Sequence, residues 1–214
     1  MELVWDQAGE RRFETGIDRG VLFLPEGSAV PWNGITNMTE SLGREVKSYY
    51  VDGVKYMDHQ VIAAFQGTLQ ALTYPDEMEE LTGTVPFAPG VFVHDQRSKA
   101  FHLCYRTLVG NDLDGADHGY KLHILYNVLA TPGNLQYASL GSIVNAQVFQ
   151  WTLNAIPPQI FGIRPTSHVS LHTRSLDPAL LTQLEELLYG TEETDPELPD
   201  LPDLLNMVEV FYTP

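Results

Sequence analysis

Seven histidines and one cysteine are the residues of this sequence best suited to bind a metal ion or to act in catalysis. His102 and Cys104 are two residues apart in a segment whose alternation predicts a strand, so they share a face. If the register of a hairpin pairs His102 with His123, three ligands suited to zinc meet at one point. The alternative interpretation is that these are ordinary strand residues, with Cys104 a small apolar filler rather than a nucleophile.

A second histidine pair does not suit a single metal ion. His168 and His172 are four residues apart in a predicted strand and share a face. At about 3.3 Å per residue they are about 13 Å apart along that strand. Zinc bonds are about 2 Å long, so one ion cannot bridge this pair.

Carboxylates gather in the polar segment 110–119, which holds Asp112, Asp114 and Asp117 and also His118. The segment has neither the full spacing nor the closing bidentate Glu of an EF-hand. It is interpreted as a solvated hairpin tip that contacts a neighbouring subunit, and weak binding of an ion is the alternative.

Catalytic sequence motifs are missing. The sequence has no nucleophile elbow, no glycine-rich phosphate loop and no paired metal-binding cysteines. The prediction is therefore a protein that is not an enzyme and has no metal or cofactor.

Strands dominate the elements that would position these side chains. Period-two alternation runs through residues 61–71 and ends at Tyr74-Pro75-Asp76. Further alternating segments surround Phe101–Tyr105, Leu122–Val128, Phe149–Leu153 and Val169–Leu171. Asn33-Gly34 predicts a turn.

One helix is predicted over residues 178–189. Asp177 is placed to cap it, Pro178 fits its first turn and Gly190 is placed to end it. Leu181, Leu184 and Leu188 fall on one side, with Leu180 and Leu187 beside them. The predicted fold is mainly β (α+β): a β-sandwich or barrel with one flanking α-helix.

Three regions are expected to lie outside this core. Residues 1–20 are predicted to be an N-terminal arm, residues 77–99 a long loop, and residues 191–214 an acidic, proline-rich surface tail. The β-domain with its helix is expected to span residues 21–190. Loops as long as 77–99 usually have a task or are disordered.

Composition limits the classes of partner. Lys plus Arg is 12 and Asp plus Glu is 28, which gives a net charge of −16. Tight nucleic-acid binding depends on basic groups that neutralise phosphates, so it is not expected here. A single cysteine fits a chain made in a reducing cytoplasm. No signal peptide and no membrane-spanning apolar run are seen, so no membrane partner is expected.

Aromatic residues cluster ahead of the first long strand, at Trp32, Tyr49, Tyr50 and Tyr56. Core packing is one interpretation. A subunit interface, where aromatic side chains are enriched, is the other.

Several ordered blocks resemble the tail tube (major tail) proteins of long-tailed, siphovirus-like phages of actinobacteria. The blocks are GERRFETGIDRG at 9–20, VPWNGIT at 30–36 with TES at 39–41, TYPDE at 73–77, YRTLVGND at 105–112, DHGYKLH at 117–123 and LLYGT at 187–191. The resemblance spans about residues 5–191.

The resemblance implies a structural virion protein with a fold like that of phage and type VI secretion tubes. Such proteins form a β-sandwich with a flanking helix, and six copies make a ring that stacks into a tube for DNA ejection. Expected partners are other copies of the chain, tail tip or baseplate proteins, tape measure and tail terminator proteins, and phage DNA that passes without specific binding. The expected location is the virion tail, after synthesis in the host bacterial cytoplasm.

The family carries no catalytic residues, so its motifs are taken only as assembly candidates. These are Arg11, Arg12, Arg19, Trp32, Asp112, Asp114, Asp117 and His118. An acidic lumen would repel phosphates and keep DNA mobile. Two rival hypotheses remain: a monomeric sandwich that binds a ligand such as carbohydrate, and a metal-dependent enzyme centred on His102, Cys104 and His123.

Overall fold

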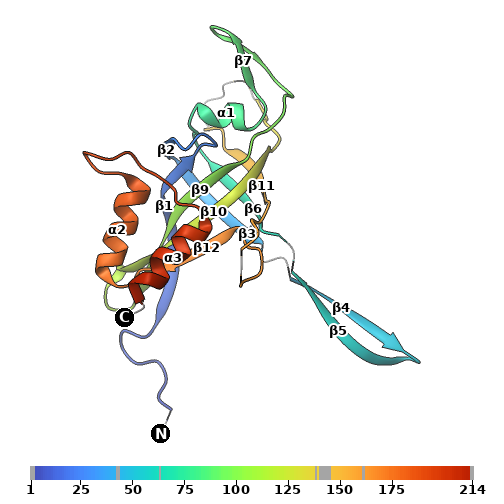
Figure 1. The fold of residues 1–214 in the computed structure, drawn as a ribbon, viewed down its shortest axis with the longest axis vertical. Coiled ribbons are helices and arrows are strands. Elements are labelled where there is room, and N and C mark those ends of the chain that lie inside the picture. The colour runs from blue at the N-terminus through green and yellow to red at the C-terminus, as the bar shows by residue number, and fades with distance from the viewer. Residues whose placement is uncertain are drawn as a thin grey trace.

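A computed structural model describes residues 3–41, 44–62, 64–137, 139, 146–160 and 162–212, with side chains at 44, 45, 61 and 62 outside the description. The chain is mainly β, as the sequence predicts. The main sheet contains β1 (Arg12–Phe23), β2 (Ala29–Trp32), β3 (Ile35–Ser41), β6 (Gln66–Ala71), β9 (Phe101–Asn111), β10 (Gly115–Pro132), β11 (Phe149–Ala155) and β12 (His168–His172) (Figure 1). Its order is β2-β1-β9-β10-β11-β6-β3, and β12 pairs with β10.

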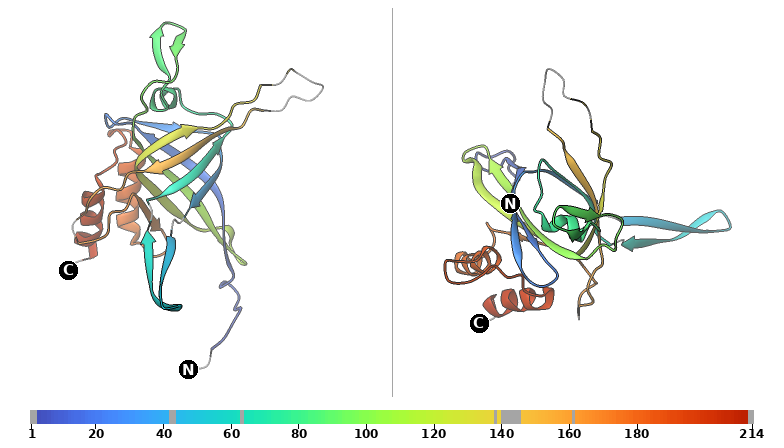
Figure 2. Two further views of the ribbon diagram at one scale, coloured as in Figure 1. Left: turned by 90° about the vertical axis from the view of Figure 1, so that its right-hand side faces the viewer. Right: turned by 90° about the horizontal axis from the view of Figure 1, so that it is seen from above.

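The sheet curls so strongly that its opposite edges approach each other (Figure 2). Strand β1, next to one edge, contacts β3 at the other edge, although the two strands do not pair. Gly20 leaves room for this approach, since a Cβ at that position would lie 2.4 Å from Ile35 Cδ1 and 3.0 Å from Trp32 O, and the Ile35 side chain would have to shift. The first core fills the concave side of the curl. Its members include Leu22, Trp32, Leu69, Phe101, Leu103, Tyr105, Leu125, Trp151 and Leu153.

Alternation in β9 divides the residues between two cores. Phe101, Leu103 and Tyr105 belong to the first core and Cys104 to the second, which confirms the predicted face. In β10 the alternation predicts one face for Leu122, Ile124, Tyr126 and Val128. The first three lie in the second core, but the prediction is wrong for Val128. A register shift lies between Leu125 and Val128, and Asn127 has φ 53° there, so Val128 turns into the first core.

Two helices cover the outer side of β1, β9, β10 and β12 (Figure 1). The first, α2 (Pro178–Tyr189), has the predicted bounds, and Asp177 Oδ1 accepts a hydrogen bond from Ala179 N at 2.8 Å. Its buried residues are Leu180, Leu184 and Leu188, so Leu180 takes the place expected for Leu181.

The expected surface tail 191–214 is wrong for residues 201–212. They form a second helix, α3 (Leu201–Tyr212), which buries Leu201 and Leu204 in the second core. Tyr126 also donates a hydrogen bond to Pro199 O at 3.1 Å. The tail was predicted from the acidic residues 192–203, most of which precede α3, whereas the helix itself has an apolar stripe that places it against the sheet.

The N-terminal arm is shorter than expected. Strand β1 begins at Arg12 and pairs with β9 from Arg12 to Phe23. Residues 3–11 contain no strand or helix. The predicted arm is therefore wrong for residues 12–20, where the polar composition reflects an exposed, paired strand.

Two hairpins replace other expectations. The predicted single strand 61–71 is divided between β5 (Val54–Ile62), which pairs with β4 (Arg44–Val51) in a separate sheet, and β6. The predicted loop 77–99 contains α1 (Glu77–Leu81), β7 (Val85–Ala88) and β8 (Val91–Val93). Among the described residues, no helix is both long and apolar enough to cross a membrane.

Candidate functional site

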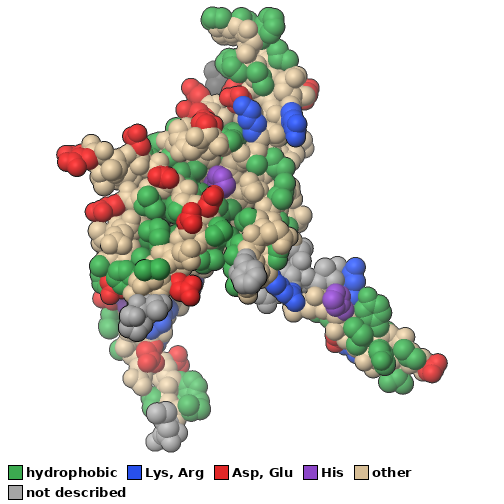
Figure 3. Space-filling model, in the orientation of Figure 1, with side chains coloured by type: hydrophobic (Ala, Val, Ile, Leu, Met, Phe, Trp, Pro, Cys, Tyr) green, Lys and Arg blue, Asp and Glu red, His purple; other side chains and the backbone are tan. Residues whose placement is uncertain are grey.

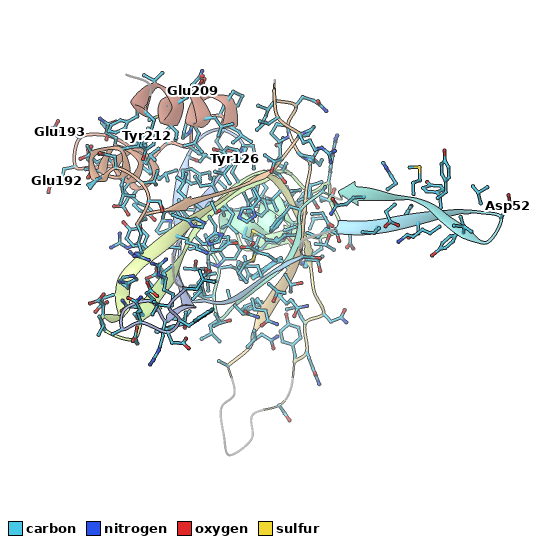
Figure 4. All side chains as sticks on the ribbon, turned by 90° about the horizontal axis from the view of Figure 1, so that it is seen from below. Asp52, Tyr126, Glu192, Glu193, Glu209 and Tyr212 are labelled. Carbon is cyan, nitrogen blue, oxygen red and sulfur yellow. The ribbon has the colours of Figure 1, made fainter. Side chains whose placement is uncertain are left out.

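The β4–β5 hairpin is the most prominent projection of the molecule (Figure 1). Asp52 and Gly53 form its turn with φ values of 49° and 77°. Positive φ at both central residues is typical of the two-residue turns that match strand twist. Figure 4 places Asp52 at the tip, far from the helices.

No part of the described chain covers this hairpin. Every residue from 46 to 60 is exposed. The exposed large apolar side chains in this range are Val46, Tyr49, Tyr50, Val51, Val54, Tyr56 and Met57. Tyr49 lies directly opposite Met57 in the register. An isolated hairpin is marginally stable in water, and apolar exposure of this extent is typical of an interaction site (Figure 3).

The hairpin differs in charge from the rest of the chain. Between residues 46 and 60, Lys47 and Lys55 balance Asp52 and Asp58, whereas the whole chain has a net charge of −16. A neutral hairpin can therefore approach a second acidic copy without the repulsion that two acidic surfaces would meet.

The four aromatic residues Trp32, Tyr49, Tyr50 and Tyr56 divide between a core position and exposed positions. Trp32 is 2% exposed, stands edge-on to Trp151 at 5.3 Å and donates from its indole nitrogen to Thr73 O at 3.0 Å. Trp32 is thus a core residue and not a surface contact, which corrects its selection as an assembly candidate. Tyr49, Tyr50 and Tyr56 are exposed on the hairpin.

The three arginine candidates lie on the surface. Arg11 donates to Asp6 O at 3.2 Å, and Arg12 opens β1 opposite Asn111. Arg19 lines an open cavity of about 540 Å³ between β1 and the β2–β3 turn, with its guanidinium 5.7 Å from the Tyr189 ring.

The acidic segment is shorter and more ordered than expected, because only residues 112–114 separate β9 from β10. Asn111 Oδ1 accepts from the backbone nitrogens of Leu113 and Asp114, at 3.1 and 2.6 Å. Asp112 accepts from Gly9 N at 2.9 Å, and His118 lies 2.8 Å from Asp114 Oδ2. Asp117 is exposed. The tip therefore binds the chain's own N-terminal segment.

The metal centre proposed around His102, Cys104 and His123 does not form. The register pairs His123 with Tyr105, and Cys104 with Ile124. His102 instead packs edge-on against Tyr126 at 5.6 Å, while Cys104 is fully buried. Burial raises the pKa of the Cys104 thiol to about 12, which makes it an apolar filler rather than a nucleophile.

A different cluster joins Glu40, His123 and His168 (β3, β10 and β12). His123 Nδ1 lies 3.2 Å from both His168 Nε2 and Glu40 Oε1. The candidate donor atoms of all three side chains lie within 4.8 Å of one another.

Neighbouring side chains fix this cluster in place. Thr107 Oγ1 lies 2.9 Å from His123 Nε2, and the Tyr105 hydroxyl donates to Glu40 Oε1. The Tyr105 and His123 rings stack with centroids 4.8 Å apart.

Electrostatics differ within the cluster. Burial acts to raise the pKa of Glu40, but hydrogen bonds from His123 and Tyr105, together with the electrostatic interactions with His168 and His123, outweigh it and lower the pKa to about 2. Burial lowers the pKa of His168, which favours its neutral form. A carboxylate beside a neutral imidazole is therefore the state expected near neutral pH.

Sequence reasoning missed this cluster. It depends on β12 pairing with β10, so that Leu125 faces His168, and on the curl that brings β3 across the sheet. The spacing of residues along the chain predicts neither the pairing of β12 with β10 nor the curl of the sheet. The hairpin did carry a signal, since Asp52-Gly53 stands between two segments that contain the strand-forming residues Val and Tyr.

No protein-family model matches the sequence, and no curated protein matches it. Among solved structures, the chain is similar to the anti-feeding prophage cap (AFP tube terminating cap), with 13% identity and a TM-score of 0.40 over 80% of this chain and 95% of that chain. It is also similar to the PVC sheath/tube terminator in the extended state, with 11% identity and a TM-score of 0.38 over 79% and 99%. A third similarity is to the PVC sheath-tube complex in the extended state, with 13% identity and a TM-score of 0.35 over 72% and 88%.

Proposed function

We propose that this chain is a structural subunit of a phage-tail-type tube, assembled by contacts between copies and without catalytic activity. The observation that carries the proposal is the β4–β5 hairpin, whose residues 46–60 are all exposed and which carries seven large apolar side chains. Such a surface in a protein of net charge −16 needs a partner that covers it.

The proposed partner is a second copy of the chain. The hairpin projects from the side of the sheet opposite the helices, so its far end lies beyond the reach of the subunit's own core (Figures 1 and 2). The β7–β8 hairpin projects elsewhere and exposes Phe87, Val91 and Phe92. Two apolar projections on one body suit contacts with more than one neighbour, as a stack of rings requires.

Hexameric rings, passage of DNA and contacts with tail tip, tape measure and terminator proteins follow from the sequence resemblance and belong to the same proposal. In this account the virion tail is the site of action. The excess of carboxylates would keep DNA mobile in the lumen, since phosphates and carboxylates repel each other.

Sedimentation velocity over a range of concentrations tests the role of the hairpin. The wild-type chain is expected to form larger species as concentration rises, whereas the Tyr50→Ser/Tyr56→Ser double variant stays monomeric with an unchanged thermal transition. Val210→Ser is the matched control, because Val210 is equally exposed but lies on α3. If the wild type, the double variant and Val210→Ser all associate equally, the hairpin is not the surface through which copies assemble.

A further inference from the structure

We propose that Glu40, His123 and His168 bind one zinc(II) ion and that this ion joins β3 to β10 and β12. The donor set is two imidazoles and one carboxylate, which is typical of zinc sites that keep a fourth position for water. The proposal stands independently of tube assembly, because all three residues belong to one chain.

The distances suit a tetrahedral ion. Zinc bonds of about 2.0–2.1 Å at tetrahedral angles place two donors about 3.3 Å apart. His123 Nδ1 lies 3.2 Å from one donor on His168 and 3.2 Å from one on Glu40. The remaining pair lies within 4.8 Å, so a small rotation of either side chain completes the geometry.

The surroundings resemble the outer shell of a metal site. With zinc on His123 Nδ1, the proton sits on Nε2, which can donate to Thr107 Oγ1 at 2.9 Å. Hydrogen bonds of this kind fix the tautomer and orientation of a ligating histidine. The Tyr105 hydroxyl in turn holds Glu40 Oε1. Two of the three ligands, His123 and Glu40, are therefore already oriented.

An ion here has a mechanical role. Strand β3 ends the path of the sheet, and among the described strands it pairs only with β6. Glu40 nevertheless reaches His123 and His168 across the concave side. Zinc would close this end of the curl, where no backbone ladder links β3 to β10 or β12. Glu40 and His168 are partly exposed, which gives the ion a route from solvent.

Titration with zinc and with cobalt(II) tests the site in the full-length chain after treatment with a chelator. Calorimetry is expected to show one zinc per chain, and cobalt is expected to give the visible absorption of a four-coordinate ion. Glu40→Gln and His168→Gln should each weaken zinc binding by on the order of 100-fold or more, and Thr107→Val by about 10- to 100-fold.

His172→Gln is the matched control, because His172 lies on the same strand and is exposed. It should bind zinc like the wild type. Circular dichroism confirms that each variant is folded. If the wild-type chain binds no stoichiometric metal, or if the Glu40 and His168 variants bind as tightly as His172→Gln, the cluster is a hydrogen-bonded network only and the proposal is wrong.

Discussion

Arg106 holds Asp18 through two parallel hydrogen bonds, from Nε to Oδ1 at 2.6 Å and from Nη2 to Oδ2 at 2.5 Å. Asp18 lies where the pairing of β1 with β9 shifts register twice, after Thr15 and before Val21. The Arg106 guanidinium also lies 4.8 Å over the Tyr120 ring, and Tyr120 donates to Glu185 of α2 at 2.7 Å. The pair thus connects an irregular strand to both the sheet and the helix.

Replacement of Arg106 should destabilise the fold. Arg106→Lys keeps the charge but loses the planar fork, and it is expected to lower the free energy of unfolding by about 1 kcal/mol. Arg106→Ala also loses the stacking and should lower it by about 1–3 kcal/mol, toward the lower end because Asp18 remains partly hydrated. Urea unfolding measures both. Arg97→Ala, at an exposed position, is the control, and an equal effect there would contradict the role of the pair.

Cys104 should be inert in the folded protein. It is fully buried, and burial raises its pKa to about 12, so the reactive thiolate is scarce at pH 8. A thiol reagent is expected to modify it on the order of 10³-fold more slowly in native buffer than in denaturant, since access requires large-scale opening. Rapid modification of the native protein would show that the second core is open at β9.

Glu40 should make stability depend on pH in the acid range. Its pKa falls from the ordinary 4.5 to about 2 in the folded protein, so folding favours the carboxylate. The resulting stabilisation is fully present above pH 4.5 and is lost as the pH falls toward 2. The difference in unfolding free energy between wild type and Glu40→Gln, measured with chelator present, should therefore shrink over that interval. A difference that is constant from pH 6 to pH 2 would contradict this linkage.

The N-terminal segment should contribute to assembly more than to folding. Removal of residues 1–11 breaks the contacts of Gly9 with Asp112 and Asn111, which are exposed or half-buried hydrogen bonds, and should cost less than about 1 kcal/mol of stability. Removal of residues 1–16 also deletes the part of β1 paired with residues 108–111 of β9 and should cost more. Thermal unfolding of the two truncated chains compares them. The shorter deletion is expected to block self-association while leaving a cooperative transition, and a chain 12–214 that fails to fold would contradict this division.

The sequence predicted correctly those features of the fold that depend on neighbouring residues, such as the faces of strand β9 and the two ends of helix α2. Alternation placed Phe101, Leu103 and Tyr105 on one face, and Asp177 and Gly190 delimited α2 correctly. A backbone irregularity at Asn127 was invisible, because it depends on how β10 passes from one neighbour to another. The apolar stripe of α3, by contrast, is a local pattern in residues 201–212 that the acidic segment before it outweighed in the prediction.

The same distinction between local and long-range determinants applies to the two candidate sites. Asp52-Gly53 is a local signal for the β4–β5 hairpin, although the alternation through residues 61–71 predicted one strand where residues 61–62 belong to β5 and residues 66–71 to β6. The cluster of Glu40, His123 and His168 joins strands far apart in sequence. Only the pairing of β12 with β10 and the curl of the sheet bring these side chains together, so sequence spacing could not predict it.

The central claim is that copies of this chain assemble into a tube. Negative-stain electron microscopy of the concentrated wild-type protein, alone and with the tail tip complex, tests it most directly. The account predicts rings or stacked tubes in the wild-type sample and dispersed single subunits for Tyr50→Ser/Tyr56→Ser. Single subunits in every wild-type sample, at all concentrations and salt conditions and with the tip complex present, would contradict it.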